Sequence, residues 1–75
     1  HAITVGRLPE CSITVTDPQV SRHHAEIRPD GDGYLLVDLG STNGTTVNGT
    51  LVRDHRLADG DVLSFGATSI RFEAS

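Results

Sequence analysis

Residues 40–50 read GSTNGTTVNGT, and they contain the triplet Asn-Gly-Thr twice, beginning at Asn43 and at Asn48. An Asn-Gly pair typically forms the tight turn of a β-hairpin, because both residue types tolerate positive φ angles. Only residues 45–47 separate the two pairs, which is barely the length of a strand. The stretch therefore indicates β-structure, and it raises the question of whether both pairs turn the chain or one has a different role.

Hydrophobic and polar residues alternate on both sides of this stretch, as they do in strands with one buried face. Residues 34–39, YLLVDL, form a more continuous apolar run, which is typical of a strand covered on both faces. No window of helical length carries an apolar stripe of helical period. The alternating segments are residues 2–6, 12–16, 24–28, 61–65 and 68–73.

Turn-forming residues lie between these segments, among them Asp17-Pro18, residues 29–33 (PDGDG) and residues 58–60 (ADG). Short strands at regular spacing, separated by turns, predict an all-β sandwich or barrel. A length of 75 residues allows one small domain, which we assign to residues 1–75. The first predicted strand begins almost at residue 1, so we expect this domain to be a fragment of a longer protein.

Composition limits the classes of function. The formal net charge is −4, which argues against a nucleic-acid binder that relies on a basic field. The single cysteine, Cys11, excludes an internal disulfide and a multi-cysteine zinc site, and it fits a cytoplasmic setting. No apolar run approaches the length of a membrane span, so we expect no membrane insertion by this domain. Nothing in the sequence suggests a cofactor cavity.

Three polar clusters lie at the ends of predicted strands, where loops commonly carry function. They are Gly6-Arg7, residues 21–24 (SRHH) and residues 41–44 (STNG). An arginine fork binds phosphate oxygens in a bidentate manner, and hydroxyl and amide donors complete the coordination. Because the clusters are rich in donors and poor in acceptors, they suit a dianionic ligand.

Other chemistries have less support. A metal site at His23-His24 is not expected, because adjacent strand residues point to opposite faces and no third ligand is evident. Val62 stands where the nucleophile motif G-x-S-x-G requires glycine. No carboxylate pair or nucleophile–base set occurs, so a small hydrolase or metal enzyme is disfavoured and we expect no catalytic residue.

Taken in order, residues 5–7 (VGR), 21–27 (SRHHAEI), 38–49 (DLGSTNGTTVNG) and 57–66 (LADGDVLSFG) resemble the forkhead-associated (FHA) domain. The resemblance extends from Ile3 to Phe72. It implies a sandwich of two antiparallel sheets with about eleven strands, which binds phosphothreonine peptides through loops at one end. The family normally has one or two strands before the Gly-Arg strand, so the resemblance implies that N-terminal strands are missing from this chain.

The resemblance also implies a role for individual residues. In such domains the counterparts of Arg7 and Ser21 contact the phosphate, and the residue after the serine, here Arg22, adds a further contact. Thr42 and Asn43 match the positions that meet the phosphothreonine and the peptide main chain. The expected phosphothreonine-binding set is therefore Arg7, Ser21, Arg22, Thr42 and Asn43.

Further residues are expected to support this site or to select the peptide. Structural support is expected from Gly6, His24 and Gly44. The candidates to read the residue three beyond the phosphothreonine are Gln19, Gly66, Ala67 and Thr68. In this interpretation Asn43-Gly44 forms a recognition loop, whereas Asn48-Gly49 is an ordinary hairpin turn between residues 46–47 and 51–52.

The function that the resemblance implies is a phosphothreonine-dependent protein-interaction module of bacterial Ser/Thr kinase signalling, not an enzyme. Its expected partners are phosphothreonine-containing proteins, such as a Ser/Thr kinase or its substrate. A second interpretation keeps the fold but makes it a phosphate-independent scaffold or oligomerisation domain. Salt-sensitive binding that requires phosphorylation distinguishes the first from the second, and turnover of a substrate would instead support an enzyme.

Overall fold

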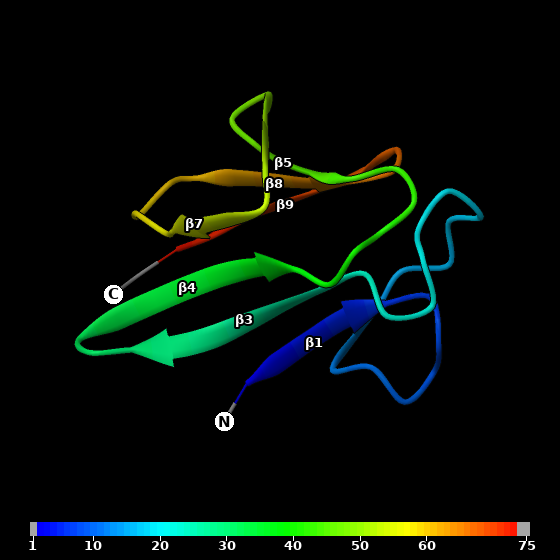
Figure 1. Cartoon of the computed structure of the whole chain (residues 1–75), viewed down its shortest axis with the longest axis horizontal. Helices are drawn as coiled ribbons and strands as arrows, with labels where there is room; N and C mark the ends of the chain where they lie inside the picture. Colours follow the sequence, from blue (N-terminus) through cyan, green and yellow to red (C-terminus); the bar gives the residue numbers. More distant parts are fainter. Residues whose placement is uncertain (1, 74–75) are drawn as a thin grey trace.

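Nine strands and no helix form the part of the chain that the computed structural model describes, residues 2–73 (Figure 1). The strands are β1 (Ile3–Gly6), β2 (Ile13–Thr14), β3 (Ala25–Asp30), β4 (Gly33–Asp38), β5 (Thr45–Val47), β6 (Thr50–Val52), β7 (Asp54–Arg56), β8 (Val62–Phe65) and β9 (Thr68–Arg71). The resemblance implied about eleven strands, so the described residues contain fewer strands than expected. Residues 2–73 contain no helix that is long and apolar enough to span a membrane.

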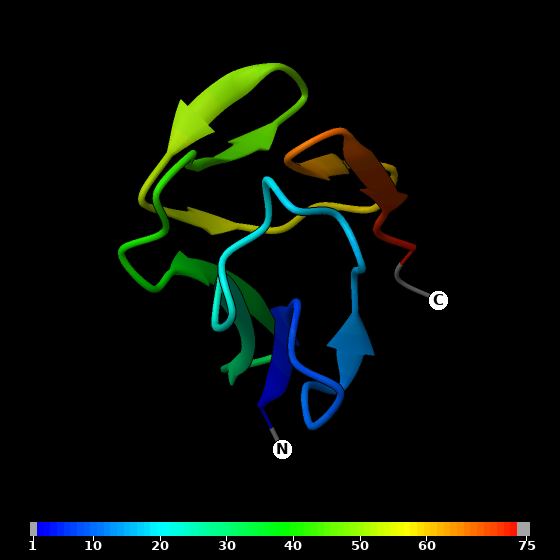
Figure 2. The ribbon, with the colours of Figure 1, turned by 90° about the vertical axis from the view of Figure 1, so that its right-hand side faces the viewer.

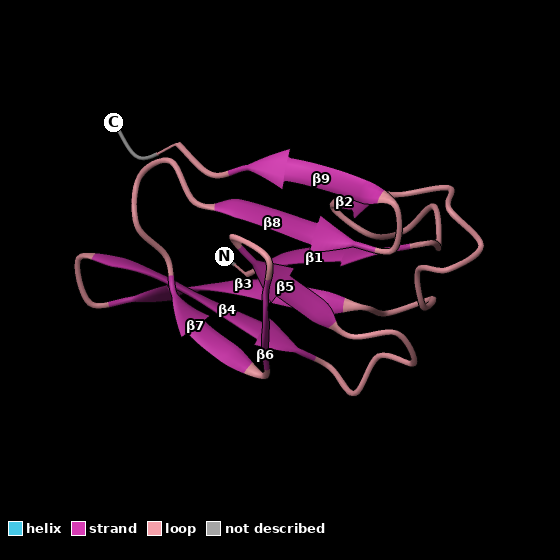
Figure 3. Ribbon diagram, turned by 90° about the horizontal axis from the view of Figure 1, so that it is seen from above, coloured by secondary structure: helices cyan, strands magenta, loops and turns pink. Residues whose placement is uncertain are grey.

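The strands form two sheets that pack face to face, which confirms the predicted all-β sandwich (Figures 1 and 3). The five-stranded sheet has the order β2-β1-β3-β4-β7, and the four-stranded sheet has the order β6-β5-β8-β9. Two antiparallel sheets were expected, but β2 runs parallel to β1. The loop of residues 7–12 brings the chain back along β1, so that the Thr4 amide donates to Ser12 Oγ at 3.2 Å before β2 begins.

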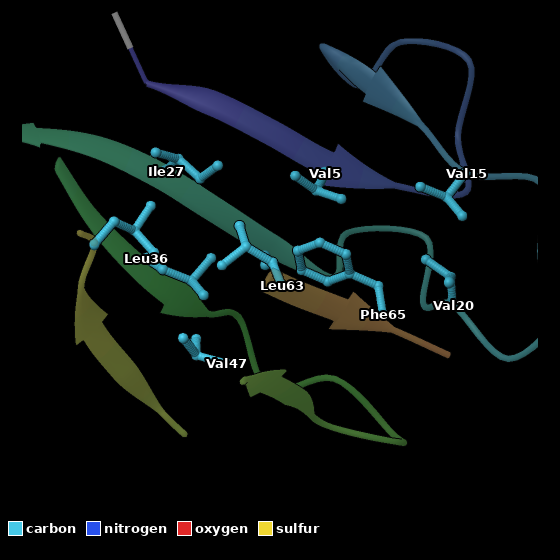
Figure 4. Close-up of a cluster of buried hydrophobic side chains, with 10 residues drawn as sticks. Val5, Val15, Val20, Ile27, Leu36, Val47, Leu63 and Phe65 are labelled. Carbon is cyan, nitrogen blue, oxygen red and sulfur yellow. The ribbon is translucent and has the colours of Figure 1, made fainter. Parts of the chain in front are cut away.

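The core lies between the sheets and is built from the alternating residues of both (Figure 4). Val5 of β1, Leu36 of β4 and Phe65 of β8 are fully buried. The run of residues 34–39 was predicted to be covered on both faces, but Leu35 and Val37 are only half-buried. The reason is that a two-layer sandwich buries one face of each sheet and leaves the other face in contact with solvent.

Strand β7 was not predicted, since Asp54, His55 and Arg56 carry no apolar alternation. It forms because its backbone pairs with the edge of β4, where His55 lies opposite Leu36. An edge strand of this kind needs few buried side chains, and charged residues on it discourage pairing with other molecules. Residue periodicity therefore gives no signal for it.

The hairpin of β5 and β6 turns at Asn48 and Gly49, as predicted. Their φ angles are 52° and 84°, the pair of positive values that a type I′ turn requires. The Asn48 side chain adds two hydrogen bonds to the neighbouring chain at the start of β8, in the same sheet: Nδ2 donates to Asp61 Oδ1 at 2.9 Å, and Oδ1 accepts from the Val62 amide at 3.0 Å. Asn48 therefore shapes the turn and also anchors it to the start of β8.

Four loops gather at one end of the sandwich, on the right in Figure 1 and facing the viewer in Figure 2. They follow β1, precede β3, follow β4 and join β8 to β9. The turn between β3 and β4 and the segment before β8 lie at the opposite end (Figure 1). All three polar clusters of the sequence thus lie on the same end.

Replacing Asn48 by alanine is expected to lower the free energy of unfolding by about 1–3 kcal/mol, because alanine disfavours positive φ and loses both side-chain hydrogen bonds. Asn48→Gly keeps the turn geometry and loses only the hydrogen bonds, so it should cost less. Urea denaturation of both variants measures the two contributions. The control is Asn43→Ala, a chemically identical change at an exposed loop residue, and a larger loss in that control would contradict this account of Asn48.

Candidate functional site

Arg7 follows β1 and is seated on the backbone of the segment that precedes β3. The Arg7 amide donates to the Ser21 carbonyl at 3.1 Å, and its side-chain Nε donates to the Val20 carbonyl at 3.1 Å. The side chain is otherwise exposed. Within residues 2–73 only Nε of the guanidinium has a hydrogen-bond partner, so the two terminal nitrogens are available to a ligand.

Gly6 lets β1 approach the same segment closely. A Cβ atom at residue 6 would lie 2.1 Å from the Arg22 carbonyl oxygen and 2.9 Å from Cys11 Sγ. No other residue fits this contact without moving the backbone. The Arg22 carbonyl also accepts a hydrogen bond from Cys11 Sγ at 3.4 Å, whereas the Arg22 side chain is exposed. Gly6 therefore sets the distance between Arg7 and the loop that carries Ser21.

The loop after β4 meets the same segment from the other side. Ser21 Oγ accepts a hydrogen bond from the Thr42 amide at 3.1 Å, which leaves the Ser21 hydroxyl proton free to donate elsewhere. Asn43 Nδ2 donates to the Gln19 carbonyl at 2.7 Å. The structure therefore brings the three polar clusters together, with Arg7 and Asn43 on either side of Ser21.

His24 is fully buried beneath these loops. Its Nδ1 accepts a hydrogen bond from the Ser21 amide at 3.1 Å, so Nε2 carries the proton and donates to the Gly44 carbonyl at 2.8 Å. The ring packs edge-on against Phe65, with centroids 5.4 Å apart. A ring with both nitrogens used in this way supports the loops and cannot reach a ligand.

Asp38 organises the loop after β4, and sequence reasoning did not single it out. Its Oδ1 accepts from the Gly40 and Ser41 amides, both at 2.8 Å, and its Oδ2 accepts from Ser41 Oγ at 2.6 Å and Thr45 Oγ1 at 2.8 Å. Ser41 Oγ in turn accepts from the Gly44 amide at 3.0 Å. The signal available in the sequence was an aspartate two residues before a glycine, a common turn arrangement.

The expected selectivity residues lie beside Asn43. Gly66, with φ at 61°, is so close to the loop before β3 that a Cβ atom at residue 66 would be 3.1 Å from Gln19 Cβ. Gln19 and Ala67 are exposed, whereas Thr68 begins β9 and is half-buried. Gln19, Gly66 and Ala67 therefore form one surface at the edge of the site, and Thr68 follows it as the first residue of β9.

Two arginines, Arg7 and Arg22, lie at this end although the chain is acidic. Within residues 2–73, neither Arg7 nor Arg22 forms an ion pair, whereas Arg56 is paired with Asp30 and Asp32 at the opposite end. The same residues contain no group of three side chains that could hold a metal ion. The loop end therefore offers unpaired cations and hydrogen-bond donors to an anion.

A hollow of about 690 Å³ lies away from these loops, between the sheets near the β3–β4 turn. None of the expected site residues lines it. Its walls are apolar and polar in about equal measure: Ile3, Ile13, Ile27, Leu57, Leu63, Ile70 and Phe72 line it together with Asp32, Arg56, Arg71 and Glu73. The candidate site is therefore a surface formed by loops and not a cavity.

Comparison with known sequences agrees with this geometry. Residues 3–66 match the family described as the FHA domain. This chain belongs to the FHA domain family. The FHA domain-containing protein FhaA of Mycobacterium tuberculosis is 50% identical over 66 residues, a match that covers 88% of this chain and 12% of FhaA. The glycogen accumulation regulator GarA of Mycolicibacterium smegmatis is 42% identical over 69 residues, which cover 92% of this chain and 44% of GarA.

A solved structure from an analysis of phosphothreonine-dependent FHA domain interactions superposes with a TM-score of 0.94 and 44% identity, over 99% of this chain and 77% of the other. The chain is thus homologous to FHA domains whose interactions depend on phosphothreonine. It spans less than half the length of the two relatives named above. It is a binding domain and not an enzyme, as expected, and its relative GarA is a regulator.

Replacing His24 by alanine is expected to destabilise this FHA domain by about 2–4 kcal/mol, because it opens a cavity and leaves the Ser21 amide and the Gly44 carbonyl without their buried partner. His23→Ala is the matched control, since His23 is adjacent but exposed and should change stability little. Thermal melting of the two variants measures the difference. Equal melting temperatures would show that the ring does not hold the loops.

Acid should weaken the loop that Asp38 organises. Burial raises the pKa of Asp38, but the hydrogen bonds from Ser41, Thr45 and Gly40 outweigh burial and hold the pKa below its ordinary value of 3.8. A lowered pKa in the folded state means that the stabilisation is complete above the ordinary pKa and is lost as the pH falls below it. Urea denaturation between neutral pH and about pH 3 should show this loss, with a smaller pH dependence in Asp38→Asn. An unchanged dependence in that variant would contradict the assignment.

Proposed function

We propose that this FHA domain binds phosphothreonine-containing segments of other proteins at the loop end of the sandwich. The phosphate is held by Arg7 and Ser21, with a further contact from Arg22. Thr42 and Asn43 hold the phosphothreonine and the adjacent peptide main chain. Gln19 and the turn of Gly66 and Ala67 contact residues that follow the phosphothreonine, as does Thr68.

The observation that supports this proposal best is the set of hydrogen bonds that fixes Ser21 between two loops. Its carbonyl accepts from the Arg7 amide and its hydroxyl accepts from the Thr42 amide, both at 3.1 Å. The guanidinium of Arg7 and the hydroxyl proton of Ser21 are therefore presented together on fixed backbone. Donors that are ordered before the ligand arrives lose little entropy on binding.

The charge of the ligand explains why such a small surface suffices. A phosphothreonine carries about −1.5 to −2 charges at neutral pH and three strong acceptor oxygens. Hydrogen bonds to charged groups contribute about 1.5–3 kcal/mol each, so a few of them distinguish the phosphorylated peptide from the unphosphorylated one. The net charge of −4 on the whole chain disfavours unrelated polyanions such as nucleic acids.

Bacterial Ser/Thr kinase signalling is the proposed setting, in which the domain docks a phosphorylated kinase or a kinase substrate in the cytoplasm. The homology to FhaA and GarA supports this assignment. Residues 1–75 then act as one binding module within a longer protein. No cofactor or metal is required, because the phosphate is held by side chains alone.

Replacing Arg7 by alanine is expected to weaken phosphopeptide binding by roughly 10- to 150-fold, which corresponds to one lost charge-assisted contact. The fold should remain intact, since the Arg7 side chain is exposed. Fluorescence anisotropy with a degenerate phosphothreonine peptide library and its unphosphorylated counterpart measures the effect. Arg71→Ala, which removes the same charge from an exposed site on β9, is the matched control.

The same titrations include Asn43→Ala and Asn48→Ala. Asn43→Ala should lose binding, because an amide both donates and accepts and can bracket a peptide bond. Asn48→Ala should retain binding wherever it remains folded. Near-normal affinity of a folded Arg7→Ala protein, or equal binding of phosphorylated and unphosphorylated peptides by the unaltered protein, would refute the proposed function.

A further inference from the structure

A carboxylate occupies the end of the molecule that is proposed to bind a dianion. Asp17 lies in the loop before β3, four residues from Ser21 in the sequence. A negative charge near an anion site opposes binding, so the presence of this side chain requires a compensating role. Its hydrogen bonds indicate what that role is.

Asp17 connects two loops that are far apart in the sequence. Its Oδ1 accepts from the Gln19 amide at 2.9 Å, and its Oδ2 accepts from the Ala67 amide at 2.8 Å, across 50 residues of sequence. The bond to Gln19 alone would be a common turn formed by an aspartate with the backbone two residues on. The bond to Ala67 has no local explanation, because it joins the β8–β9 turn to a different loop.

The turn is also packed tightly against the residues that it joins. A Cβ atom added to Gly66 would lie 2.9 Å from Asp17 Oδ2 and 3.1 Å from Gln19 Cβ. The positive φ of Gly66, 61°, also disfavours any side chain at this position. Glycine at residue 66 therefore permits the contact, and the Asp17 carboxylate holds it.

Gln19 is fixed at both of its backbone groups. Its amide donates to Asp17, and its carbonyl accepts from Asn43 Nδ2 at 2.7 Å. Its side chain is exposed and forms no hydrogen bond within residues 2–73. An amide on such a fixed backbone presents a donor and an acceptor in a defined position to a bound peptide.

We propose that Asp17 is the positioning residue for peptide selectivity, because it clamps Gly66 and Ala67 to Gln19 so that the three residues present one surface beside the phosphate site. The proposal rests on the proposed function and extends it to residues other than the phosphothreonine. In this role Asp17 acts through the residues that it holds, because each of its two oxygens accepts a hydrogen bond from a backbone amide. The two amide donors hold the pKa of Asp17 below its ordinary value, so the carboxylate remains an acceptor at neutral pH.

The test uses two phosphothreonine peptides that differ at one position. A phosphothreonine peptide library first identifies the position after the phosphothreonine at which the unaltered domain discriminates most strongly. Anisotropy titrations then give the ratio of the two dissociation constants for the unaltered domain and for Asp17→Asn, whose amide group cannot accept from both backbone amides. This ratio is expected to fall by between about twofold and tenfold, the effect of one lost hydrogen bond. The ratio of the dissociation constants for the unphosphorylated and the phosphorylated peptide should stay the same in Asp17→Asn as in the unaltered domain.

Asp61→Asn is the matched control. Asp61 also accepts a backbone hydrogen bond, from the Ala58 amide at 2.8 Å, but it lies at the opposite end of β8. This substitution should lower stability without changing selectivity, so it separates positioning from general destabilisation. If Asp17→Asn does not fold, Asp17→Glu provides the same test, because it keeps the charge but its longer side chain moves the carboxylate away from the two amides.

The possible outcomes are distinct. A selectivity ratio that falls in Asp17→Asn, or in Asp17→Glu where Asp17→Asn does not fold, but not in Asp61→Asn, supports the proposal. An unchanged ratio in a folded variant, an equal fall in the control, or an unaltered domain with no preference at any position overturns it. A failure of the proposed function appears differently, as equal binding of phosphorylated and unphosphorylated peptides by the unaltered domain.

Discussion

The imidazole of His24 links the core of the sandwich to the loops above it. Its Nδ1 accepts from the Ser21 amide and its Nε2 donates to the Gly44 carbonyl, so the ring has a single tautomer and orientation. The edge-on contact with Phe65 fixes the same ring against the fully buried last residue of β8. The relative position of two loops, and therefore of Ser21 and the loop of Asn43, depends on this one buried group.

Three carboxylates fix loops in a similar way. Asp17, Asp38 and Asp61 each accept backbone amide hydrogen bonds, and in each case the hydrogen bonds lower the pKa in the folded state. For Asp38 the hydrogen bonds also outweigh the effect of burial, which raises the pKa. In an acidic chain these groups act as internal acceptors, and the unpaired arginines remain available at the loop end. The residues that fix the geometry of the loops are therefore different from the residues that offer positive charge to a ligand.

Local pattern predicted most of the fold but not all of it. The alternating segments around Val5, Ile27 and Leu63 became strands because a half-buried strand repeats every two residues. Strand β7 could not be predicted, since its stability comes from backbone pairing with β4 and not from its own side chains. The parallel pairing of β2 with β1 was also missed, because it depends on the path of the loop between them.

By itself, the sequence determined the fold class, the hairpin turn at Asn48-Gly49 and the chemistry available in the polar loops, since each of these depends on neighbouring residues. The motifs also sufficed to identify the FHA family. Only the tertiary structure decided which nitrogen of His24 carries the proton, that Asp38 organises the loop after β4, and that Asp17 reaches Ala67 across 50 residues. The physical reason is that these contacts join segments that are distant along the chain, and such contacts are set by the packing of the two sheets and not by local periodicity.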